Sequence, residues 1–536
     1  MNTDVIGWSL GPGRTEESFD FLTPRAVGVK VGEFVHYDHE DDKILCRVTQ
    51  RDRVESSDET IDAMSSYIPD DDLDVFRSSH GHRVTARILG KYDESFGSFQ
   101  NLRSPPSIGQ DIHMTSDSFL SSVISPEKEM GTLRVGSLLN RPGDAVEIDV
   151  DMDEIATKHL SVLASTGAGK SYTVGVLLEE MSKPHNRASS VVFDIHAEYS
   201  TLAEDERYGD SFNHIDDPKI KISSLGVEDF DVAFPEEMTS LQRERLRELL
   251  RTLDIGDPSK SDPWRDRVRT NYSVGDMIEK LNPSDELDAS VAWRLESLLD
   301  FHSLRTEEET PIEDLCEPGK CNIVEFPSGA GKLERNLILW HFTRRILEAR
   351  KRSMRKKRHS SGIDEVDIID VPVTLFIEEA HNFAPSDRQL KTRGLLQEIA
   401  REGRKFGVGL SVISQRPSRL DEDVLSQCNS SVVMKVRNGV DQDAIERTVE
   451  SAGEDLIRDL PGLTTGQAVL AGSFINTPVL VGIRQRETEH GGVTPDVAEE
   501  SVSAYESQSQ TQPQSRSQTE SDPRGGSSPS SRSKER

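Results

Sequence analysis

One segment, Ala164 to Ser171, restricts the possible folds more than any other part of the 536-residue chain. It reads ASTGAGKS and follows a short apolar run, HLSVLAS (159–165), with a predicted helix continuing to about Met181. A Gly-rich loop followed by Lys and Ser, after a strand and at the start of a helix, is typical of a phosphate-binding P-loop. The segment therefore predicts a nucleotide-binding α/β fold.

Each position of this loop has an expected role. Gly167 and Gly169 let backbone N–H groups approach phosphates, and the helix adds its positive dipole end. Lys170 is expected to reach the β- and γ-phosphates of ATP, and Ser171 to ligate Mg²⁺. Ala164 replaces the usual first Gly, which an unstrained strand end allows. The predicted nucleotide contacts are Ser165, Thr166, Gly167, Ala168, Gly169, Lys170, Ser171 and Tyr172.

A second Gly-x-Gly-Lys segment, SGAGKL (328–333), resembles the loop only in part. Phe326 occupies the position of the first small residue, and Leu333 replaces the hydroxyl that would ligate Mg²⁺. We therefore reject it as a second P-loop.

An acidic pair follows a later apolar run, VTLFIEEAH (373–381). Glu378 is predicted to hold Mg²⁺ through water, and Glu379 to orient or deprotonate the attacking water. The first carboxylate is usually Asp, so the longer Glu378 shifts the water network slightly. On its own, a pair of carboxylates after a strand is weak evidence for an ATPase site. The evidence is stronger here because a P-loop lies in the same domain.

Two further segments carry candidate catalytic residues. GVGLSVISQRP (407–417) ends its apolar run at Gln415, a candidate γ-phosphate sensor, although Gln415 could simply begin a turn before Pro417. Arg401 and Arg404 lie three positions apart on one face of a helix end. Such a guanidinium can enter a neighbouring subunit's site and stabilise transition-state charge. The alternative is a solvated basic helix terminus.

Local patterns predict three folded parts and a tail. Short β-like runs, VGEFVHYD (31–38), KILCRVTQ (43–50) and HRVTARILG (82–90), predict a small antiparallel barrel or sandwich within 1–130. Buried strands alternating with helices predict a mostly parallel sheet formed by 131–200 and 311–492. Helices at 238–253 and 291–304 indicate a helical insertion, 201–310. The Ser-, Gln- and Pro-rich stretch 493–536 is expected to be disordered.

The composition is strongly acidic, with 95 Asp and Glu against 64 Lys and Arg and a formal charge of −31. Because the acidic residues are dispersed, we interpret them as adaptation to a salt-accumulating (halophilic) cell, where screening makes such a charge tolerable. An ordinary acidic enzyme is the alternative. The four scattered cysteines are expected to be structural thiols. We expect a cytoplasmic location, because neither a signal peptide nor a run of 18 apolar residues is found.

Together these motifs resemble the HerA-type hexameric DNA translocases of the HerA–FtsK superfamily. The resemblance spans about residues 131–492, is weak in the barrel and absent from the tail. The matching stretches are RVGSLLNRPGDAVEIDVD, HLSVLASTGAGKS, VVFDIHAEYS, LFIEEAHNFAP, IAREGRKFGVGLSVISQRPSRLDEDVLSQCN and LPGLTTGQAVLAGSFINTPVLVGIRQRETEHGG.

The resemblance implies an N-terminal β-barrel, a RecA-like P-loop core and a helical insertion. It implies a homo-hexamer that translocates duplex DNA with ATP and Mg²⁺, with sites between subunits, and a NurA-type nuclease as partner in DNA end processing. It assigns Lys170, Ser171, Glu378, Glu379 and Gln415 to nucleotide chemistry. It adds Asp194 and Glu198 as site carboxylates, and Arg401, Arg404 and Arg141 as residues that act on a neighbouring subunit.

Two other functions remain open at this stage: a DNA-pumping ATPase of the same superfamily in conjugation or phage defence, and a non-motor scaffold that binds ATP. The one strongly basic run, RRILEARKRSMRKKRH (344–359), could face DNA or a partner. We favour the interpretation that this basic run is a solvated helix end.

Overall fold

The computed structural model describes residues 5–13, 15, 17–24, 29–55, 59–78, 81–93, 95, 98–100, 104–254, 271–359, 368–449, 453–491 and 501–503. Its internal contacts divide the chain into two units, Met1–Gly491 and Gly492–Arg536. The first unit contains every element discussed below. The predicted disorder of 493–536 lies outside the described residues, apart from 501–503, which are helical.

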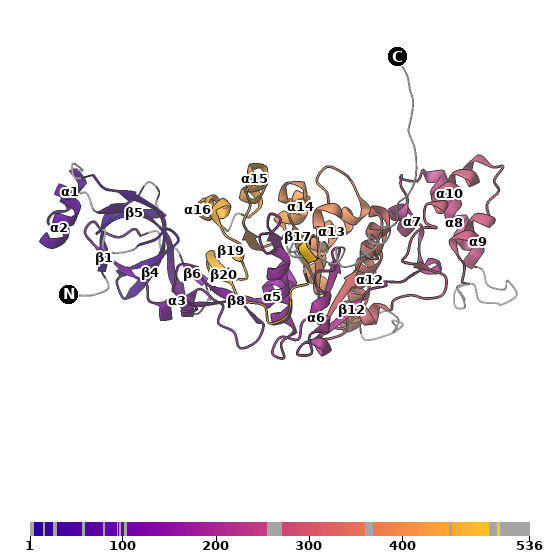
Figure 1. The fold of residues 1–536 in the computed structure, drawn as a ribbon, viewed down its shortest axis with the longest axis horizontal. Coiled ribbons are helices and arrows are strands. Elements are labelled where there is room, and N and C mark those ends of the chain that lie inside the picture. The colour runs from indigo at the N-terminus through magenta and orange to yellow at the C-terminus, as the bar shows by residue number, and fades with distance from the viewer. Residues whose placement is uncertain are drawn as a thin grey trace, which may run out of the picture. The chain divides into compact units, whose positions relative to one another are not determined.

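The N-terminal part is a closed antiparallel barrel, drawn in indigo and purple in Figure 1. The strands follow the order β2-β1-β7-β3-β4-β5, and pairing of β2 with β5 closes the ring. Inward-facing residues such as Phe19, Phe21 and Val35 fill its core. The predicted small barrel is thus confirmed. Its elements are β1 (Val5–Pro12), β2 (Ser18–Thr23), β3 (Phe34–His39), β4 (Asp42–Arg53), α1 (Glu59–Met64), α2 (Asp70–Arg77), β5 (His82–Asp93), β6 (Ser98–Gln100), β7 (Asp111–Met114) and α3 (Asp117–Val123).

The α/β core is built on one large mixed sheet, in the order β12-β15-β11-β16-β17-β10-β18-β19-β20-β8-β9. Neighbours from β12 to β18 pair in parallel, and those from β18 to β9 pair antiparallel. This is the predicted RecA-like arrangement. The strands are β8 (Thr132–Leu138), β9 (Glu147–Asp151), β10 (Leu160–Leu163), β11 (Ser189–Asp194), β12 (Phe212–Ile215), β15 (Cys321–Glu325), β16 (Val373–Ile377), β17 (Val408–Ser414), β18 (Ser430–Met434), β19 (Gln467–Gly472) and β20 (Val479–Ile483).

Helices cover both faces of this sheet, which explains why its central strands are apolar throughout. Along β11, Val191 and Phe193 pack into the hydrophobic cluster on one face, and Val192 packs into the cluster on the other. The core helices are α4 (Met152–Lys158), α5 (Lys170–Ser182), α6 (Ser200–Glu204), α11 (Ile312–Leu315), α12 (Lys332–His359), α13 (Lys391–Glu402), α14 (Glu422–Ser426), α15 (Gly439–Thr448) and α16 (Glu454–Asp459).

The predicted helical insertion is present, with two differences from expectation. Its elements are β13 (Ile220–Lys221), α7 (Val227–Ala233), α8 (Ser240–Asp254), α9 (Val274–Glu279), α10 (Glu286–Glu296) and β14 (Leu304–Arg305). The helix predicted over 291–304 is α10, which begins earlier because the Asp285 carboxylate accepts from the Leu287 and Asp288 N–H groups. The helix predicted over 238–253 is α8, which begins at Ser240; its Leu246 and Leu249 are buried, whereas Leu241 is 69% exposed.

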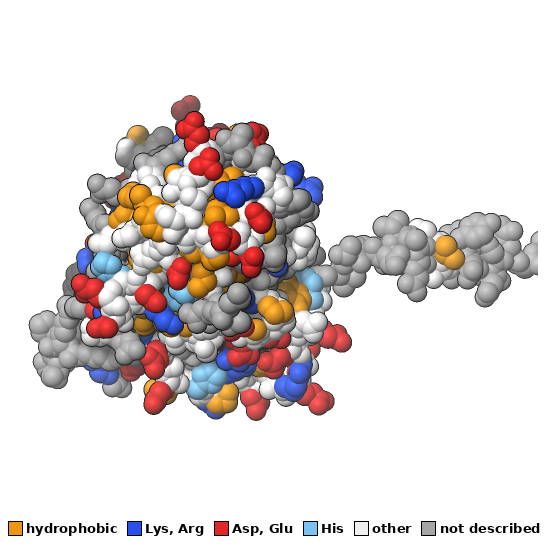
Figure 2. Space-filling model, turned by 90° about the vertical axis from the view of Figure 1, so that its left-hand side faces the viewer, with side chains coloured by type: hydrophobic (Ala, Val, Ile, Leu, Met, Phe, Trp, Pro, Cys, Tyr) orange, Lys and Arg blue, Asp and Glu red, His pale blue; other side chains and the backbone are white. Residues whose placement is uncertain are grey.

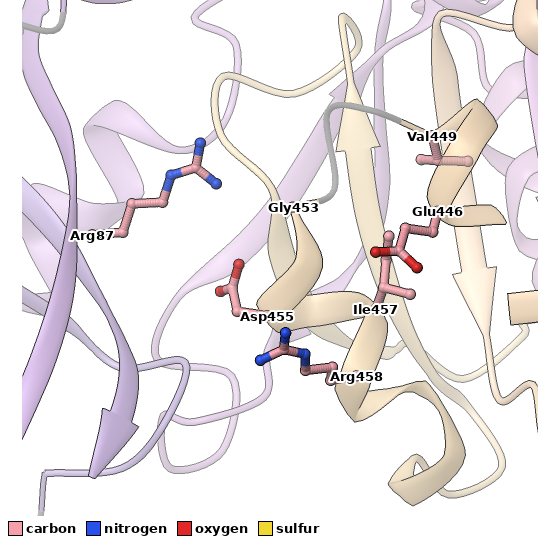
Figure 3. Close-up of a pocket in the computed structure, with 7 residues that line it drawn as sticks. All are labelled: Arg87, Glu446, Val449, Gly453, Asp455, Ile457 and Arg458. Atoms are coloured by element: carbon pink, nitrogen blue, oxygen red, sulfur yellow. The ribbon is translucent and has the colours of Figure 1, made fainter. Parts of the chain in front are cut away.

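A buried arginine joins the barrel to the core. Arg47 of β4 donates from Nη2 to Asp455 Oδ2 (2.8 Å) and from Nη1 to the Pro478 carbonyl (2.8 Å). Beside this contact, Figure 3 shows a pocket into which Arg87 of β5 and Arg458 of α16 project from opposite sides.

The described surface agrees with a dispersed acidic charge. On the face shown in Figure 2, Asp and Glu side chains are spread among basic and apolar ones instead of forming one patch. All four cysteines are buried free thiols. Within the described ranges, we find no helix long and apolar enough to cross a membrane.

Candidate nucleotide site

The P-loop connects β10 to α5 at the carboxyl edge of the parallel strands, with the geometry that phosphate binding needs. Gly167 and Gly169 adopt φ values of 76° and 102°, a region that favours glycine. A turn before β19 supports the loop: Thr465 Oγ1 donates to the Gly167 carbonyl (3.3 Å) and Gly466 N to the Ala168 carbonyl (3.3 Å). Ala164 is buried without a positive φ, so alanine fits this strand end.

The structure brings the P-loop lysine and the acidic pair together. Lys170 Nζ donates to Glu379 Oε1 at 2.5 Å, and both side chains are largely buried. Glu379 has φ 46°, a left-handed backbone that is uncommon for a residue with a side chain. Such strain is found where the surroundings fix a functional group in place. The two motifs, 209 positions apart, therefore form one site.

Glu378 lies deeper, beside Asp194. Its Oε2 accepts from the Ile195 N–H (3.0 Å), and its Oε1 is buried with no hydrogen-bond partner among the described residues. Burial, together with the nearby charge of Asp194, holds the pKa of Glu378 well above its usual range. Asp194 accepts from the His196 and Tyr199 N–H groups (3.1 and 3.0 Å), and burial raises its pKa as well. Two adjacent buried carboxyl groups are an arrangement that a cation would stabilise.

These oxygens fit Mg²⁺, which takes oxygen ligands and usually keeps several waters. Ser171 Oγ donates to Glu198 Oε2, so the predicted hydroxyl ligand and the carboxylates of Glu198 and Glu378 gather at the start of α5. Glu378 Oε1, which has no hydrogen-bond partner among the described residues, would be available to accept from a metal-bound water. In the described ranges, no group of three or more His, Cys, Asp or Glu is arranged to hold a metal ion.

Gln415 also reaches the loop. Thr166 Oγ1 donates to Gln415 Oε1 at 2.5 Å, so the candidate sensor lies where the end of β17 meets the P-loop. His381, which the sequence analysis did not single out, lies between Glu379 and β17. Its Nδ1 is 3.2 Å from Glu379 Oε2 and 3.1 Å from Ser414 Oγ. The sequence feature that could have identified His381 is its position two residues after the acidic pair.

The candidate trans-acting arginines lie away from this chain's own P-loop. Arg401 ends α13 and pairs with Asp423 (2.9 Å), while Arg404 is exposed in the turn Gly403–Phe406 that enters β17. Gln415 directly follows the other end of that seven-residue strand, so roughly 23 Å separates the two ends of the strand. Arg141 lies at the junction with the barrel, where it pairs with Glu33 (2.8 Å) and Asp117 (3.0 Å).

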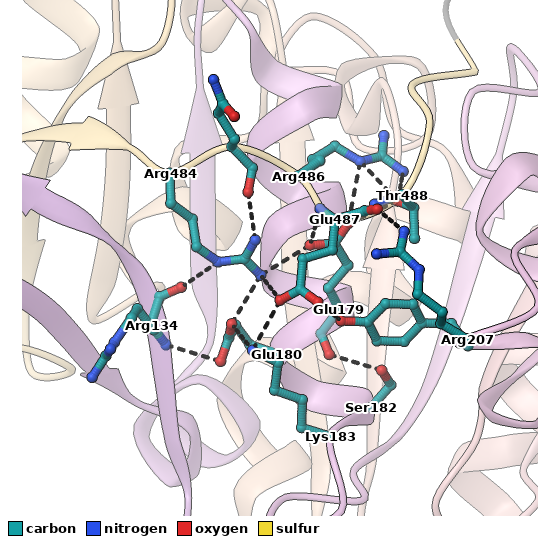
Figure 4. A network of polar contacts seen from close by, with 12 residues as sticks. Arg134, Glu179, Glu180, Ser182, Lys183, Arg207, Arg484, Arg486, Glu487 and Thr488 are labelled. Carbon is teal, nitrogen blue, oxygen red and sulfur yellow. Dashed lines mark hydrogen bonds and ion pairs between the residues drawn. The ribbon is translucent and has the colours of Figure 1, made fainter.

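A segment after β20, Arg484–Gly491, crosses α5 and is here named the strap. Figure 4 shows its polar network. Arg484 Nη2 donates to Glu179 Oε2 (2.9 Å) and Glu180 Oε1 (2.8 Å), and the fully buried Glu179 also accepts from the Thr488 N–H (3.0 Å). Sequence reasoning missed the strap, although two acidic residues inside an otherwise apolar helix could have indicated buried basic partners.

The basic run and the rejected loop both have structural roles. Arg350 of α12 is buried and donates to the carbonyls of Phe406 and Ile369 (2.8 and 2.7 Å), and Lys351 pairs with Glu398 (2.5 Å). Phe326, in the rejected SGAGKL region, is buried and stacks on Phe383 with ring centroids 6.0 Å apart. It therefore serves as a core residue.

Comparisons with known proteins agree with this geometry. Residues 133–346 match the family described as "Helicase HerA, central domain". A probable helicase of Methanocaldococcus jannaschii is 31% identical over 512 residues, covering 92% of this chain and 93% of that protein. The DNA double-strand break repair helicases HerA of Sulfurisphaera tokodaii and Pyrococcus furiosus are each 28% identical, covering 94% and 87% of this chain and 97% and 90% of their own length.

Solved structures are more distant. VirB4 of Thermoanaerobacter pseudethanolicus aligns over 67% of this chain and 98% of its own, with a TM-score of 0.49 and 15% identity. The plasmid coupling protein TrwB in complex with ADP and Mg²⁺ aligns over 70% of this chain and 94% of its own, with a TM-score of 0.45 and 14% identity.

Proposed function

Because the chain belongs to the HerA family of helicases and is an ATPase, we propose that it is an ATP-driven translocase of duplex DNA acting in double-strand break end processing. The observation that carries this proposal is the contact between Lys170 Nζ and Glu379 Oε1, which unites a phosphate-binding lysine with a candidate catalytic carboxylate. Relatives named DNA double-strand break repair helicase HerA, matched over most of the chain, support the biological role.

The site residues divide the hydrolysis reaction among them. Lys170 and the loop N–H groups hold the β- and γ-phosphates, while Ser171 and Glu378 would hold Mg²⁺ directly and through water. When bound, Mg²⁺ neutralises charge that develops on the phosphate oxygens. Glu379 orients the attacking water and accepts its proton. Gln415, anchored on Thr166, contacts the γ-phosphate from the β17 side.

DNA contact is best supported at two loops that follow β16 and β17. They run side by side, since Ser386 N donates to the Arg419 carbonyl (2.9 Å) and Asp421 N to the Ala384 carbonyl (2.8 Å). Arg388, Arg416 and Arg419 are exposed there, in the same loops that carry Glu379 and Gln415 just after the two strands. Guanidinium groups bind phosphate oxygens well. The loops therefore place exposed arginines beside the nucleotide site, where ATP binding and hydrolysis can shift their positions.

The proposal includes a ring of identical subunits. Arg404 lies at the sheet edge opposite its own P-loop, so it can contribute only to a site of another subunit. Repeating such a head-to-tail contact produces a closed ring when the rotation closes, and we propose a homo-hexamer. A NurA-type nuclease is the proposed partner in end processing. The dispersed acidic surface fits work at high salt, where counterion release contributes little to DNA binding.

The test is ATP hydrolysis by the full chain at high salt, with and without duplex DNA. DNA should stimulate the rate, and Lys170→Ala should lower it about 100-fold or more because a transition-state cation is lost. Lys332→Ala is the matched control: it removes the exposed lysine of SGAGKL and should leave the rate unchanged.

Undiminished hydrolysis by Lys170→Ala would refute the assignment of the site. A wild-type rate that duplex DNA does not raise would refute the translocase. ATP-bound hexamers without turnover would instead indicate a scaffold.

A further inference from the structure

The strap, Arg484–Gly491, brings aromatic and cationic groups beside the phosphate end of the site. Arg486 N donates to the Tyr172 hydroxyl oxygen at 2.6 Å, and the Arg486 guanidinium lies over the Tyr172 ring, 6.0 Å from its centroid. The His490 ring meets the same ring edge-on, with centroids 5.9 Å apart. Tyr172 directly follows Ser171, the predicted Mg²⁺ ligand. The cluster therefore adjoins the phosphate site.

Arg486 is held in place by its own segment and by α5. Its Nε and Nη2 donate to Thr488 Oγ1 (3.2 and 2.7 Å), its Nε is 3.7 Å from Glu179 Oε1, and its side chain is 1% exposed. Gly175 of α5 makes this fit possible: a Cβ there would lie 2.7 Å from Arg486 Cζ. Figure 4 shows Arg486 directed across the helix toward Thr488.

The far end of the strap reaches the carboxylate side of the site. Thr201 Oγ1 donates to the Glu489 carbonyl (2.9 Å), and Gly491 packs so closely on the Glu198 carbonyl that a Cβ would lie 2.8 Å from it. Glu198 is the residue that accepts from Ser171. One segment thus touches both Tyr172 and the backbone of Glu198, whose carboxylate accepts from Ser171, while His490 remains exposed.

We propose that Tyr172 and His490 form the nucleoside end of the site, where the base of ATP stacks on their rings while Lys170 and Ser171 hold the phosphates; the buried Arg486 holds Tyr172 in position. This inference rests on the ATPase function proposed above. Nucleic bases stack on Tyr and His rings with little discrimination between bases. The cluster is fixed by hydrogen bonds, so little further ordering is needed on binding.

The experiment displaces Arg486 without removing a functional group. In Gly175→Ala, the added Cβ pushes the guanidinium away, while alanine favours the helix over glycine, so the fold is retained. Gly394→Ala is the matched control, because Gly394 lies in α13 with nothing within 4 Å of an added Cβ. His490→Ala is the second variant. The full chain is titrated calorimetrically with Mg²⁺-ATP and with Mg²⁺-tripolyphosphate, which lacks a nucleoside.

We expect Gly175→Ala and His490→Ala to bind ATP about tenfold more weakly, the order expected for a lost stacking contact, with tripolyphosphate affinity unchanged. Gly394→Ala should match the wild type for both probes. Wild-type ATP affinity in both variants would overturn the inference. So would an equal loss for ATP and tripolyphosphate, which would limit the strap to support of α5. A wild-type chain that binds neither probe would refute the proposed function itself.

Discussion

At the scale of single residues, Lys170 has two competing partners. In this structure its Nζ donates to Glu379 Oε1, yet the proposed chemistry requires the same ammonium group to reach the phosphates. Phosphate binding must therefore draw Lys170 away from Glu379, which frees that carboxylate for the attacking water. In the proposed mechanism, this contact would make the base available only after ATP has bound.

This competition predicts the behaviour of Glu379→Gln, which keeps the shape of the side chain and removes its charge. Hydrolysis should fall about 10²–10⁴-fold, the usual contribution of a general base. ATP should bind as tightly as to wild type or more tightly, because Lys170 is no longer held by a carboxylate. Calorimetric affinity and single-turnover hydrolysis test this prediction.

The control for this change is Glu398→Gln, which removes the charge of a half-exposed carboxylate paired with Lys351 on the surface. It should leave both affinity and turnover unchanged. Turnover by Glu379→Gln within tenfold of wild type would contradict the assignment of the base.

The sequence could predict those site residues that occur in contiguous motifs. Lys170, Ser171 and the pair Glu378–Glu379 each follow a recognisable strand, so their positions at one sheet edge follow from the α/β pattern. Arg486 and His490 could not be found this way, because their roles depend on which distant side chains the fold brings beside them. Tyr172 was predicted as a nucleotide contact, but the strap residues that contact its side chain lie more than 300 positions away in the sequence.

At the scale of elements, apolar runs predicted the strands well. Polar capping residues account for differences between the predicted and observed starts of helices. The central strands are buried on both faces, so their sequence is apolar enough to recognise. The end of α10 was misplaced, because residues after Ser297 continue the apolar pattern in turns before β14.

The helical insertion is joined to the core by a buried charged group on α12. His341 lies 4.0 Å from Asp229 Oδ1 of α7 and 3.4 Å from Glu309 Oε1. Arg344 and Arg345 also face these carboxylates, at 3.6 and 2.6 Å. Burial alone would lower the pKa of His341, but the two carboxylates outweigh burial and raise it. The pKa values of Asp229 and Glu309 are lowered, despite burial, by His341 and the arginines.

A group whose pKa is raised by folding stabilises most at low pH, where both states carry the proton. His341→Asn should therefore lower the free energy of unfolding by about 3 kcal/mol below pH ~6.5, the value of an unperturbed histidine. The difference should shrink as the pH rises through the raised pKa of the folded state. Chemical denaturation between about pH 5.5 and 9 measures it.

His302→Asn is the control for that series, because His302 is half-exposed and lies 3.5 Å from Glu334 Oε2. Its effect should stay below about 1 kcal/mol, as for surface ion pairs. A loss in His341→Asn that is independent of pH would show that packing, not charge, joins the insertion to the core.

At the scale of the whole molecule, the proposed ring depends on where the candidate trans-acting arginines lie. Arg401 is already paired with Asp423, whereas Arg404 is exposed and makes no ion pair with any residue of the described ranges. Both lie at the amino end of β17, and the P-loop lies beyond its carboxyl end. The site around Lys170 in one chain therefore lacks a guanidinium from its own Arg404, which the proposed ring would supply from a neighbouring subunit.

This arrangement predicts complementation between two inactive proteins. Lys170→Ala subunits lack a working P-loop but offer Arg404, and Arg404→Ala subunits have the reverse defect. Each alone should hydrolyse ATP at least 100-fold more slowly than wild type, since arginine fingers contribute roughly 10³–10⁵ in rate. In mixed rings formed at equal amounts, about a quarter of the head-to-tail interfaces pair an intact P-loop with an intact Arg404, so activity should reappear. Mixing Lys170→Ala with the double variant should restore none. If mixed rings form without regaining activity, Arg404 does not act on its neighbour.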